Sequence, residues 1–528
     1  GQMELKNFDK MEKAAQNAGF DGVKIGIGIM FILLVMAFTS WQVGDVPNKM
    51  IIIVAAMFGG YMALNIGAND VANNVGPAVG SKALSLTGAI IIASIFEASG
   101  ALIAGGDVVK TIKKGIIDPA LISDPSTFVY LMMAALLSAA LWLNLATYVG
   151  APVSTTHSIV GGVLGAGIAA AGWEVANWAT MGKIAASWVI SPVLGGGIAA
   201  IFLFIIKKNV TYKTDMLSAA KKVVPILIAI MAMAFATYLS LKGLKKIVKI
   251  DLVTALGIGF SVAVVIYFIM SSYVKKAVLT LANEKASIGK LFTVPLIFAA
   301  ALLSFAHGAN DVANAIGPLA AINDAIINGG ISTKATIPLW VMIVGAVGIS
   351  IGLALFGPKL IRTVGSEITE LDQIRAYAVA MAAAITVIIA SQLGLPVSST
   401  HIAVGAVFGV GFLREFLNDR YVMSKKAYLL AHFKEEGEKV ESFIERFKTK
   451  SSTEQREMLA QVKKKSVPLK NDLVLTKKER KVLRKIMKEE FVKRSHVKKI
   501  VAAWIITVPA AGTLSAILFF TIRGFMLP

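Results

Sequence analysis

The sequence has no cysteine and little charge. Without cysteine it can form neither disulfide bonds nor thiolate metal sites. Charged residues make up 16% of its 528 residues, whereas 56% are hydrophobic, and the mean hydropathy is +0.71. This composition excludes an ordinary soluble domain and indicates an all-α, polytopic membrane protein.

Catalytic and nucleic-acid-binding signatures are missing as well. The chain contains no HExxH or Walker pattern. The formal charge is +21, but about 25 of the 53 basic residues lie between Arg414 and Lys499, most with acidic neighbours and without interleaved aromatic residues. We therefore predict no enzyme, no cofactor and no nucleic-acid partner, and we interpret 414–499 as a helical cytoplasmic domain.

Long apolar runs recur along the chain. A helix needs about 20 apolar residues to cross a bilayer, and we expect about 12 transmembrane helices in contact with membrane lipid. The long runs are 25–44, 50–66, 84–106, 127–149, 177–206, 223–241, 250–271, 291–306, 336–357, 375–395 and 500–522. Two shorter, glycine-rich segments, 153–172 and 397–413, each follow a proline and are expected to form re-entrant or discontinuous helices.

Two motifs occur twice. GANDVANNVGP at 67–77 returns as GANDVANAIGP at 308–318, and PVSTTHSIVGGVLGAG at 152–167 returns as PVSSTHIAVGAVFGVG at 396–411. The spacing between the motifs is nearly equal in the two halves, so the repeating unit is half of the protein. The predicted parts are 1–22 (polar N-terminal segment), 23–222 (repeat 1), 223–290 (linking helices), 291–413 (repeat 2), 414–499 (basic domain) and 500–528 (last helix of repeat 2).

The number of membrane crossings between equivalent points of the two repeats decides whether the repeats are parallel or inverted. Six long helices between 84 and 306 alone would make the repeats parallel, whereas one further net crossing would invert them. We favour inversion, because many secondary transporters place discontinuous helices face to face in this way. The lysine-rich loops 207–222 and 275–290 are predicted to be cytoplasmic, although four lysines between 242 and 249 then lie on the other side.

The PVS motif has the chemistry of an oxyanion site. Pro152 cannot continue a preceding helix, and Ser154 is a good N-cap for the helix that follows. A helix that begins inside a membrane leaves N–H groups unpaired at its positive end. Two such ends could hold phosphate, although the hydroxyls could instead bond to helical carbonyls. The predicted phosphate-binding residues are Ser154, Thr155, Thr156, Ser398, Ser399 and Thr400.

The GAND motif has the chemistry of a cation site. Its glycine permits either a helix break or close packing, and its amide and carboxylate oxygens are hard ligands suited to Na⁺. An intramembrane aspartate is costly without a partner, which favours a function over a simple helix cap at the interface. The predicted metal ligands are Asn69, Asp70, Asn73, Asn310, Asp311 and Asn314. Nearby histidines at 157, 307 and 401 keep proton coupling open.

The doubled GANDVAN and PVS[ST]TH motifs closely resemble those of the inorganic phosphate transporter (PiT) family. The resemblance covers both repeats but not 414–499. It implies import of inorganic phosphate, coupled to Na⁺ in many members and to protons, or as a metal–phosphate complex, in others. Sulfate permeases occur among the relatives of this family, so sulfate is an alternative substrate.

The membrane potential limits how many Na⁺ ions must accompany each phosphate. A phosphate dianion that enters a cell at 100 mV, inside negative, faces about 4.6 kcal/mol, which two Na⁺ would cancel and three would reverse. We therefore predict symport of phosphate with two or three Na⁺ by alternating access, through rocking or, as we favour, an elevator-like movement. An anion channel is the alternative of another class. We expect the cell inner membrane as location and leave a homodimer open.

Overall fold

The computed structural model describes residues 22–149, 153–243, 247–329, 337–367, 372–419, 433, 437–463 and 475–528. Regular structure within these residues is helical, apart from an isolated bridge between Ile117 and Ala176. The chain forms two compact units, one of which comprises the chain up to Val407 with Ile506–Pro528, and the other Phe408–Ile505. Each unit is described by itself.

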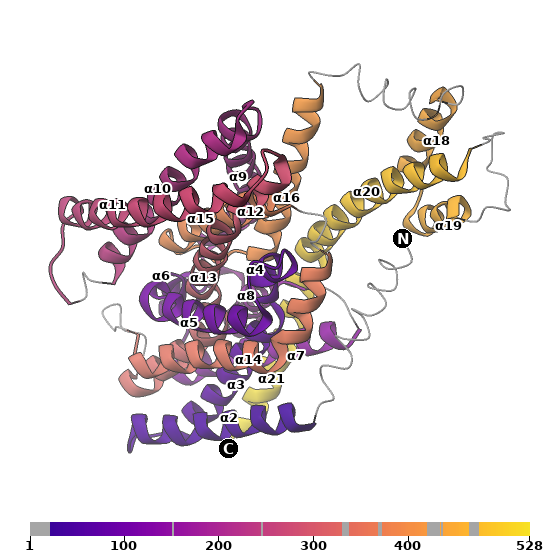
Figure 1. Cartoon of the computed structure of the whole chain (residues 1–528). Helices are drawn as coiled ribbons and strands as arrows, with labels where there is room; N and C mark the ends of the chain where they lie inside the picture. The colour runs from indigo at the N-terminus through magenta and orange to yellow at the C-terminus, as the bar shows by residue number, and fades with distance from the viewer. Residues whose placement is uncertain are drawn as a thin grey trace. The chain divides into compact units, whose positions relative to one another are not determined.

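Eleven helices within the described residues are long and apolar enough to cross a membrane. This agrees with the expectation of an all-α polytopic membrane protein. Each long run found in the sequence contains or overlaps one of them (Figure 1). Their helices are α2 (Gly22–Val43), α3 (Lys49–Asn69) with α4 (Ala72–Gly80), α5 (Leu86–Ala104), α7 (Pro125–Val149), α9 (Trp178–Ile206), α10 (Met216–Lys242), α11 (Leu252–Ala277), α13 (Thr293–Asn328), α14 (Leu339–Glu367), α15 (Gln373–Gln392) and α21 (Val508–Met526).

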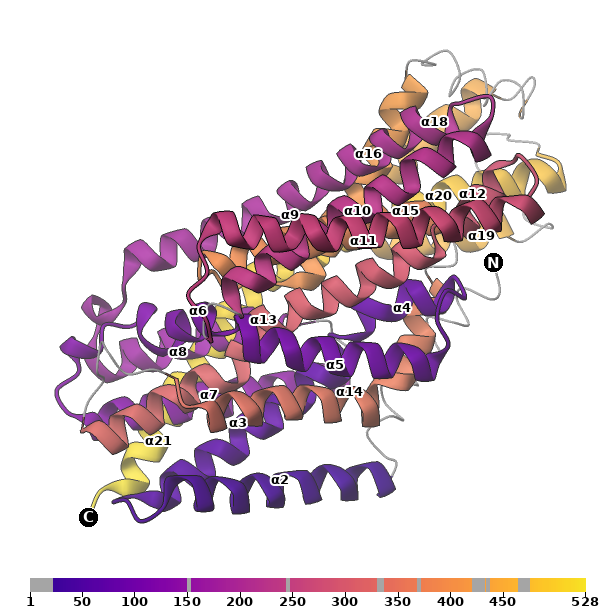
Figure 2. The same cartoon turned by 60° about the vertical axis from the view of Figure 1, so that its left-hand side comes forward.

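Helix α13 lies at the centre of the membrane unit. It runs between a group formed by α9, α10, α11 and α15 and a group formed by α2, α3, α5 and α14 (Figures 1 and 2). In its most apolar stretch 89% of the residues are buried, against 17% for α11, which exposes apolar side chains suited to lipid. The second GAND motif therefore lies in the most enclosed helix of the unit.

The two PVS motifs each start a separate helix, as predicted. These helices are α8 (Thr155–Ala171) and α16 (Ser399–Asp419). Gly394, in the segment before α16, has a left-handed φ of 71°, which glycine adopts without steric cost. The proline that follows prevents α15 from continuing, and a new helix begins three residues later.

The helix break that the GAND glycine permits occurs at the first copy of the motif but not at the second. α3 ends at Asn69 and α4 begins at Ala72, but α13 continues without interruption through 308–318. Gly308 allows close packing instead, because a Cβ there would overlap the carbonyl oxygen of Glu97. Gly67 packs in the corresponding way against Ile349. Of the two uses of glycine that the motif permits, close packing occurs in both copies.

The helices that carry the two GAND motifs run antiparallel. Gly59 of α3 faces Ala315 and Leu319 of α13, whereas Asp70, at the other end of α3, lies near His307 and Asp311. The chain therefore passes the second motif in the opposite direction from the first.

Close backbone contact between α8 and α21 gives a stability prediction. A Cβ at Gly165 would overlap backbone atoms of Gly512, so Gly165→Ala must push the helices apart. We expect a loss of about 1–3 kcal/mol, seen as a lower midpoint when the detergent-solubilised protein is heated and its monodisperse fraction is measured. Gly197→Ala is the control, since nothing lies within 4 Å of a Cβ there. Equal midpoints for the two variants would contradict the packing argument.

The second unit has its own apolar core. Its described helices include α18 (Gly437–Thr449), α19 (Ser452–Lys463) and α20 (Lys477–Ala502). The unit contains the segment 414–499 that we predicted to be a helical domain. Its buried apolar residues are Phe433, Val440, Phe443, Ile444, Phe447, Val462, Leu483 and Met487.

Candidate functional site

The first turns of α8 and α16 lie side by side. Ser154 Oγ accepts a hydrogen bond from the backbone N–H of His157 at 3.3 Å, and Ser398 Oγ accepts one from that of His401, also at 3.3 Å. The predicted N-caps are therefore confirmed. The rings of His157 and His401 have centroids 5.3 Å apart, so two positive helix ends converge from the two repeats.

Each repeat bonds the PVS motif of the other through a GAND asparagine. Asn314 donates through Nδ2 to Thr155 Oγ1 at 3.2 Å and to Thr156 Oγ1 at 3.0 Å. In the mirrored contact, Asn73 Nδ2 donates to Thr400 Oγ1 at 3.2 Å. Equivalent residues of the two repeats thus make the same contact, Asn314 with Thr156 and Asn73 with Thr400. These contacts join the predicted cation-binding and phosphate-binding residues.

Asn310 holds the segment before α16. Its Nδ2 donates to the carbonyl oxygen of Leu395 and to Ser391 Oγ, both at 3.0 Å, and its Oδ1 accepts from the N–H of Val397 at 3.1 Å. Thr156 Oγ1 donates to the carbonyl oxygen of the same valine at 3.0 Å. These bonds fix the approach to the second helix start, a role that the sequence did not indicate. The role of Asn310 as a cation ligand stays a prediction.

Two aspartates and a histidine meet beside the helix starts. Ligand atoms of Asp70, His307 and Asp311 all lie within 4.8 Å of one another. Asp70 Oδ2 accepts from Thr155 Oγ1 at 3.2 Å. Asp311 Oδ1 and Asn314 Oδ1 are buried and accept no hydrogen bond from the described part of the chain. Buried oxygens in this state are what a hard cation such as Na⁺ would use as ligands.

The remaining predicted site residues lie close to these groups. Asn69 is the last residue of α3, directly before Asp70, and Ser399 is the buried first residue of α16. Members of both predicted sets therefore lie in one region, while their individual ligand roles stay predictions.

Glu97 is a functional candidate that the sequence reasoning missed. It is fully buried in α5, where Oε1 accepts from Asn74 Nδ2 at 2.8 Å and Oε2 lies 2.8 Å from His307 Nδ1. His307 Nε2 lies 2.8 Å from Asp311 Oδ2 on its other side. Glu97, His307 and Asp311 thus form a continuous row of buried polar groups. An acidic residue inside the apolar run 84–106 was the signal that could have found it.

The pseudo-equivalent positions of the other repeat are apolar. A Cβ at Gly308 would overlap Glu97 O, and a Cβ at Gly67 would overlap Ile349 O, so Glu97 corresponds to Ile349. The residues before these glycines are His307 and Ile66, and both isoleucines are fully buried. The buried acid–imidazole pair therefore exists in only one of two matching helix crossings.

Comparison with known proteins shows the family to which this chain belongs. The model of the phosphate transporter family matches residues 66–515. This chain belongs to the phosphate transporter family. The chain is therefore a phosphate-transport protein, and its family is one of transporters, not of enzymes.

The relatives carry related names. A protein of Helicobacter pylori (strain ATCC 700392 / 26695), named "Putative phosphate permease", is 53% identical over 525 residues, which are 98% of each chain. One of Pyrococcus abyssi with the same description is 40% identical over 364 residues, 69% of this chain and 89% of its own. A solved structure named the sodium-dependent phosphate transporter matches with a TM-score of 0.71 and 31% identity, over 90% of this chain and 100% of that one.

Proposed function

We propose that this family member imports inorganic phosphate by symport with two or three Na⁺. The starts of α8 and α16 would hold the phosphate through Ser154, Thr155, Thr156, Ser398, Ser399 and Thr400. Oxygens of Asn69, Asp70, Asn73, Asn310, Asp311 and Asn314 would hold Na⁺. Sodium dependence is also in the name of the similar solved structure, although that name describes the other protein.

One observation carries the proposal: the bonds that join Asn314 to Thr155 and Thr156, with Asp70 bonded to the same Thr155. A cation at the asparagine and aspartate oxygens would lie directly beside an anion at the threonine hydroxyls. Each ion would then lower the electrostatic cost of binding the other. Such reciprocity is the thermodynamic requirement for coupled transport.

The charges of the region support more than one Na⁺. Asp70, Asp311 and a phosphate dianion would together carry four negative charges, while Glu97 and His307 compensate each other when both are ionised. Two Na⁺ would offset half of this charge and the two helix ends part of the rest. A third Na⁺ would make the cycle electrogenic, driven inward by an inside-negative potential.

We infer the orientation of the protein in the membrane from its loop lysines. Asn283 Oδ1 accepts from the backbone N–H of Met216 at 2.9 Å, so loops 207–222 and 275–290 share one face. We assign this lysine-rich face to the cytoplasm of a cell whose inner membrane holds the protein. Because the antiparallel α3 and α13 present their ligands to one region, we favour inverted repeats and an elevator-like movement of that region as a unit.

Uptake of labelled phosphate into proteoliposomes tests the proposal. Separate experiments would impose a Na⁺, Li⁺, K⁺ or pH gradient, each with and without an inside-negative potential. We expect accumulation with Na⁺ alone, a rate that rises with the second or third power of the Na⁺ concentration below saturation, and no competition from sulfate. Phosphate flux that never exceeds equilibrium under any gradient would favour a channel and contradict symport.

Proton coupling is the second candidate, because the buried chain Glu97–His307–Asp311 offers groups that can bind protons. The same experiment separates it. Accumulation driven by an inward proton gradient in Na⁺-free buffer would support proton symport and would contradict our assignment of Na⁺.

A further inference from the structure

The imidazole of His157 is buried but makes no hydrogen bond within the described part of the chain. It belongs to the first turn of α8, its side chain is fully buried, and neither Nδ1 nor Nε2 has a partner there. Buried polar atoms without partners are rare in folded proteins, because they lose the hydrogen bonds that water would give them. A ligand that supplies these bonds would therefore gain affinity from this ring.

Two aromatic side chains contact the ring of His157. The ring of Trp188, in α9, packs against it with the centroids 4.0 Å apart, and the ring of His401 lies 5.3 Å away. The indole N–H is already committed, because Trp188 Nε1 donates to the carbonyl oxygen of Pro396 at 2.9 Å. These contacts position the imidazole without using either of its nitrogens.

The neighbours of His157 contact the start of the other short helix. The preceding residue, Thr156, donates through Oγ1 to the carbonyl oxygen of Val397 at 3.0 Å, and the tryptophan bonds to the residue before that valine. His401 lies in the first turn of α16. The His157 ring therefore lies beside the positive end of α16, and an oxyanion held by the free N–H groups of that end would lie next to the imidazole.

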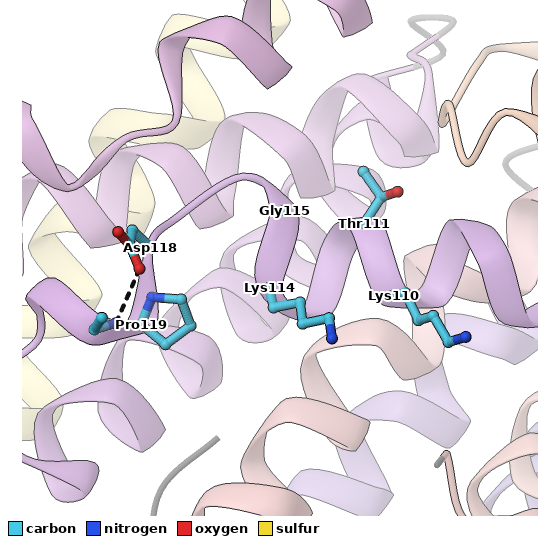
Figure 3. Close-up of a pocket in the computed structure, with 7 residues that line it drawn as sticks. Lys110, Thr111, Lys114, Gly115, Asp118 and Pro119 are labelled. Carbon is cyan, nitrogen blue, oxygen red and sulfur yellow. Dashed lines mark hydrogen bonds between the residues drawn. The ribbon is translucent and has the colours of Figure 1, made fainter. Parts of the chain in front are cut away.

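Close packing fixes the segment that leads to this helix start. A Cβ at Gly394 would lie 2.9 Å from Oγ1 of Thr111, which belongs to the turn shown in Figure 3. α9 packs equally closely against α16, since a Cβ at Gly405 would overlap the carbonyl oxygen of Pro192. The helix that carries Trp188 and the helix that carries His401 are thus held in contact, so the surroundings of the imidazole are rigid.

The hydrogen-bonding groups of this ring match hydrogen phosphate. With no carboxylate as partner, a charged ring would be costly here, and a neutral imidazole has one donor and one acceptor. Both phosphate ions present near neutral pH carry a hydroxyl, which can donate to the acceptor nitrogen while another oxygen accepts from the N–H. Sulfate has oxygens that only accept, so it would leave the acceptor nitrogen unpaired. A site that binds a hydroxyl in this way strongly rejects an analogue that lacks it.

We propose that His157 selects phosphate over sulfate by accepting a hydrogen bond from the hydroxyl of the bound phosphate. The inference rests on the proposed function, which puts phosphate at the starts of α8 and α16. The counterpart in the other repeat differs: His401 is half-buried, and its nitrogens are not among the buried unpaired atoms of the described residues. Both copies of the motif thus hold the anion, but only the first recognises its hydroxyl.

Displacement of labelled phosphate from the full-length protein in nanodiscs tests this role with three competing anions. Arsenate carries a hydroxyl, as phosphate does. Monofluorophosphate has nearly the shape and charge of hydrogen phosphate but has fluorine in place of the hydroxyl, and sulfate also lacks the donor. For the wild type we expect arsenate to compete within about threefold of unlabelled phosphate, and monofluorophosphate and sulfate to require at least about tenfold higher concentrations.

Three variants assign the preference to one ring. His157→Phe keeps an aromatic ring against Trp188 but removes both nitrogens. We expect it to bind phosphate about tenfold more weakly and monofluorophosphate nearly as before, so that the two anions compete within about threefold of each other. His157→Gln keeps one donor and one acceptor and should retain part of the preference. The matched control, His401→Phe, makes the same change at the corresponding position and should keep the wild-type preference.

A wild-type preference in His157→Phe would overturn the proposal, as would a wild type that binds phosphate and monofluorophosphate equally or a preference lost only in His401→Phe. If His157→Phe binds too little phosphate to measure, His157→Gln decides: a retained preference supports the role, and any other result overturns it. The same assay with and without Na⁺ tests the proposed function separately. Phosphate binding that does not depend on Na⁺ would contradict the proposed symport, whereas the ratio between the anions would still report on His157.

Discussion

Replacing Asp311 with asparagine is expected to reduce Na⁺-driven phosphate uptake at least a hundredfold. The carboxylate is 3% exposed and lies among the ligand atoms of Asp70 and His307. Asparagine has nearly the same shape and keeps one oxygen, so packing should persist while one negative charge is lost. A buried Na⁺ that loses a charged ligand loses about 3 kcal/mol or more of binding free energy, which corresponds to a factor of about a hundred.

The measurement compares initial uptake rates in proteoliposomes across Na⁺ concentrations. Asp70→Asn should behave alike, because Asp70 occupies the matching position of the first motif. Asp215→Asn is the control: Asp215 caps α10 through the N–H of Ser218, and asparagine caps equally well. Uptake by Asp311→Asn within threefold of the wild type, with unchanged Na⁺ dependence, would exclude the proposed cation role.

Glu97→Ile is expected to destabilise the fold, and adding His307→Ile to restore part of the stability without restoring transport. The single change leaves His307 Nδ1 and Asn74 Nδ2 without the buried carboxylate that each contacts at 2.8 Å. Breaking a buried pair in this way costs about 3–5 kcal/mol. The double variant copies the other repeat, where the pseudo-equivalent Ile66 and Ile349 are fully buried at the matching crossing.

Heating in detergent, followed by measurement of the monodisperse fraction, would give the stability of each variant, and proteoliposome uptake its activity. We expect the double variant to recover only part of the lost thermal stability, because Asn74 Nδ2 still lacks its acceptor. We expect it to transport at less than about a tenth of the wild-type rate, since Asp311 also loses its contact to His307. Wild-type transport by the double variant would show that the acid–imidazole pair serves packing alone.

Features set by local chemistry could be predicted from the sequence. Proline followed by serine marked the starts of α8 and α16, because both residues act on their own backbone and the next turn. The lengths of the apolar runs located the spanning helices for a similar reason, since lipid imposes the same requirement on every segment.

Features set by tertiary contacts could not. Glu97 and His307 are 210 positions apart, and no local pattern pairs them. The continuity of α13 through Gly308 was equally hidden, because the residue that occupies the space beside that glycine belongs to α5. From the sequence, Asn310 was interpreted as a cation ligand because of its amide oxygen. Its hydrogen bonds in the structure are to the backbone before α16, and the path of that segment could not be predicted.

The reciprocal bonds of Asn73 to Thr400 and of Asn314 to Thr156 have a consequence for how the duplicated halves depend on each other. Each half supplies its asparagine to the helix start of the other, as two subunits do when they exchange an arm. Neither half can form these bonds by itself. A separate half could form these bonds only with a second copy, as subunits do in an obligate dimer, whereas one chain that holds both halves forms them within itself.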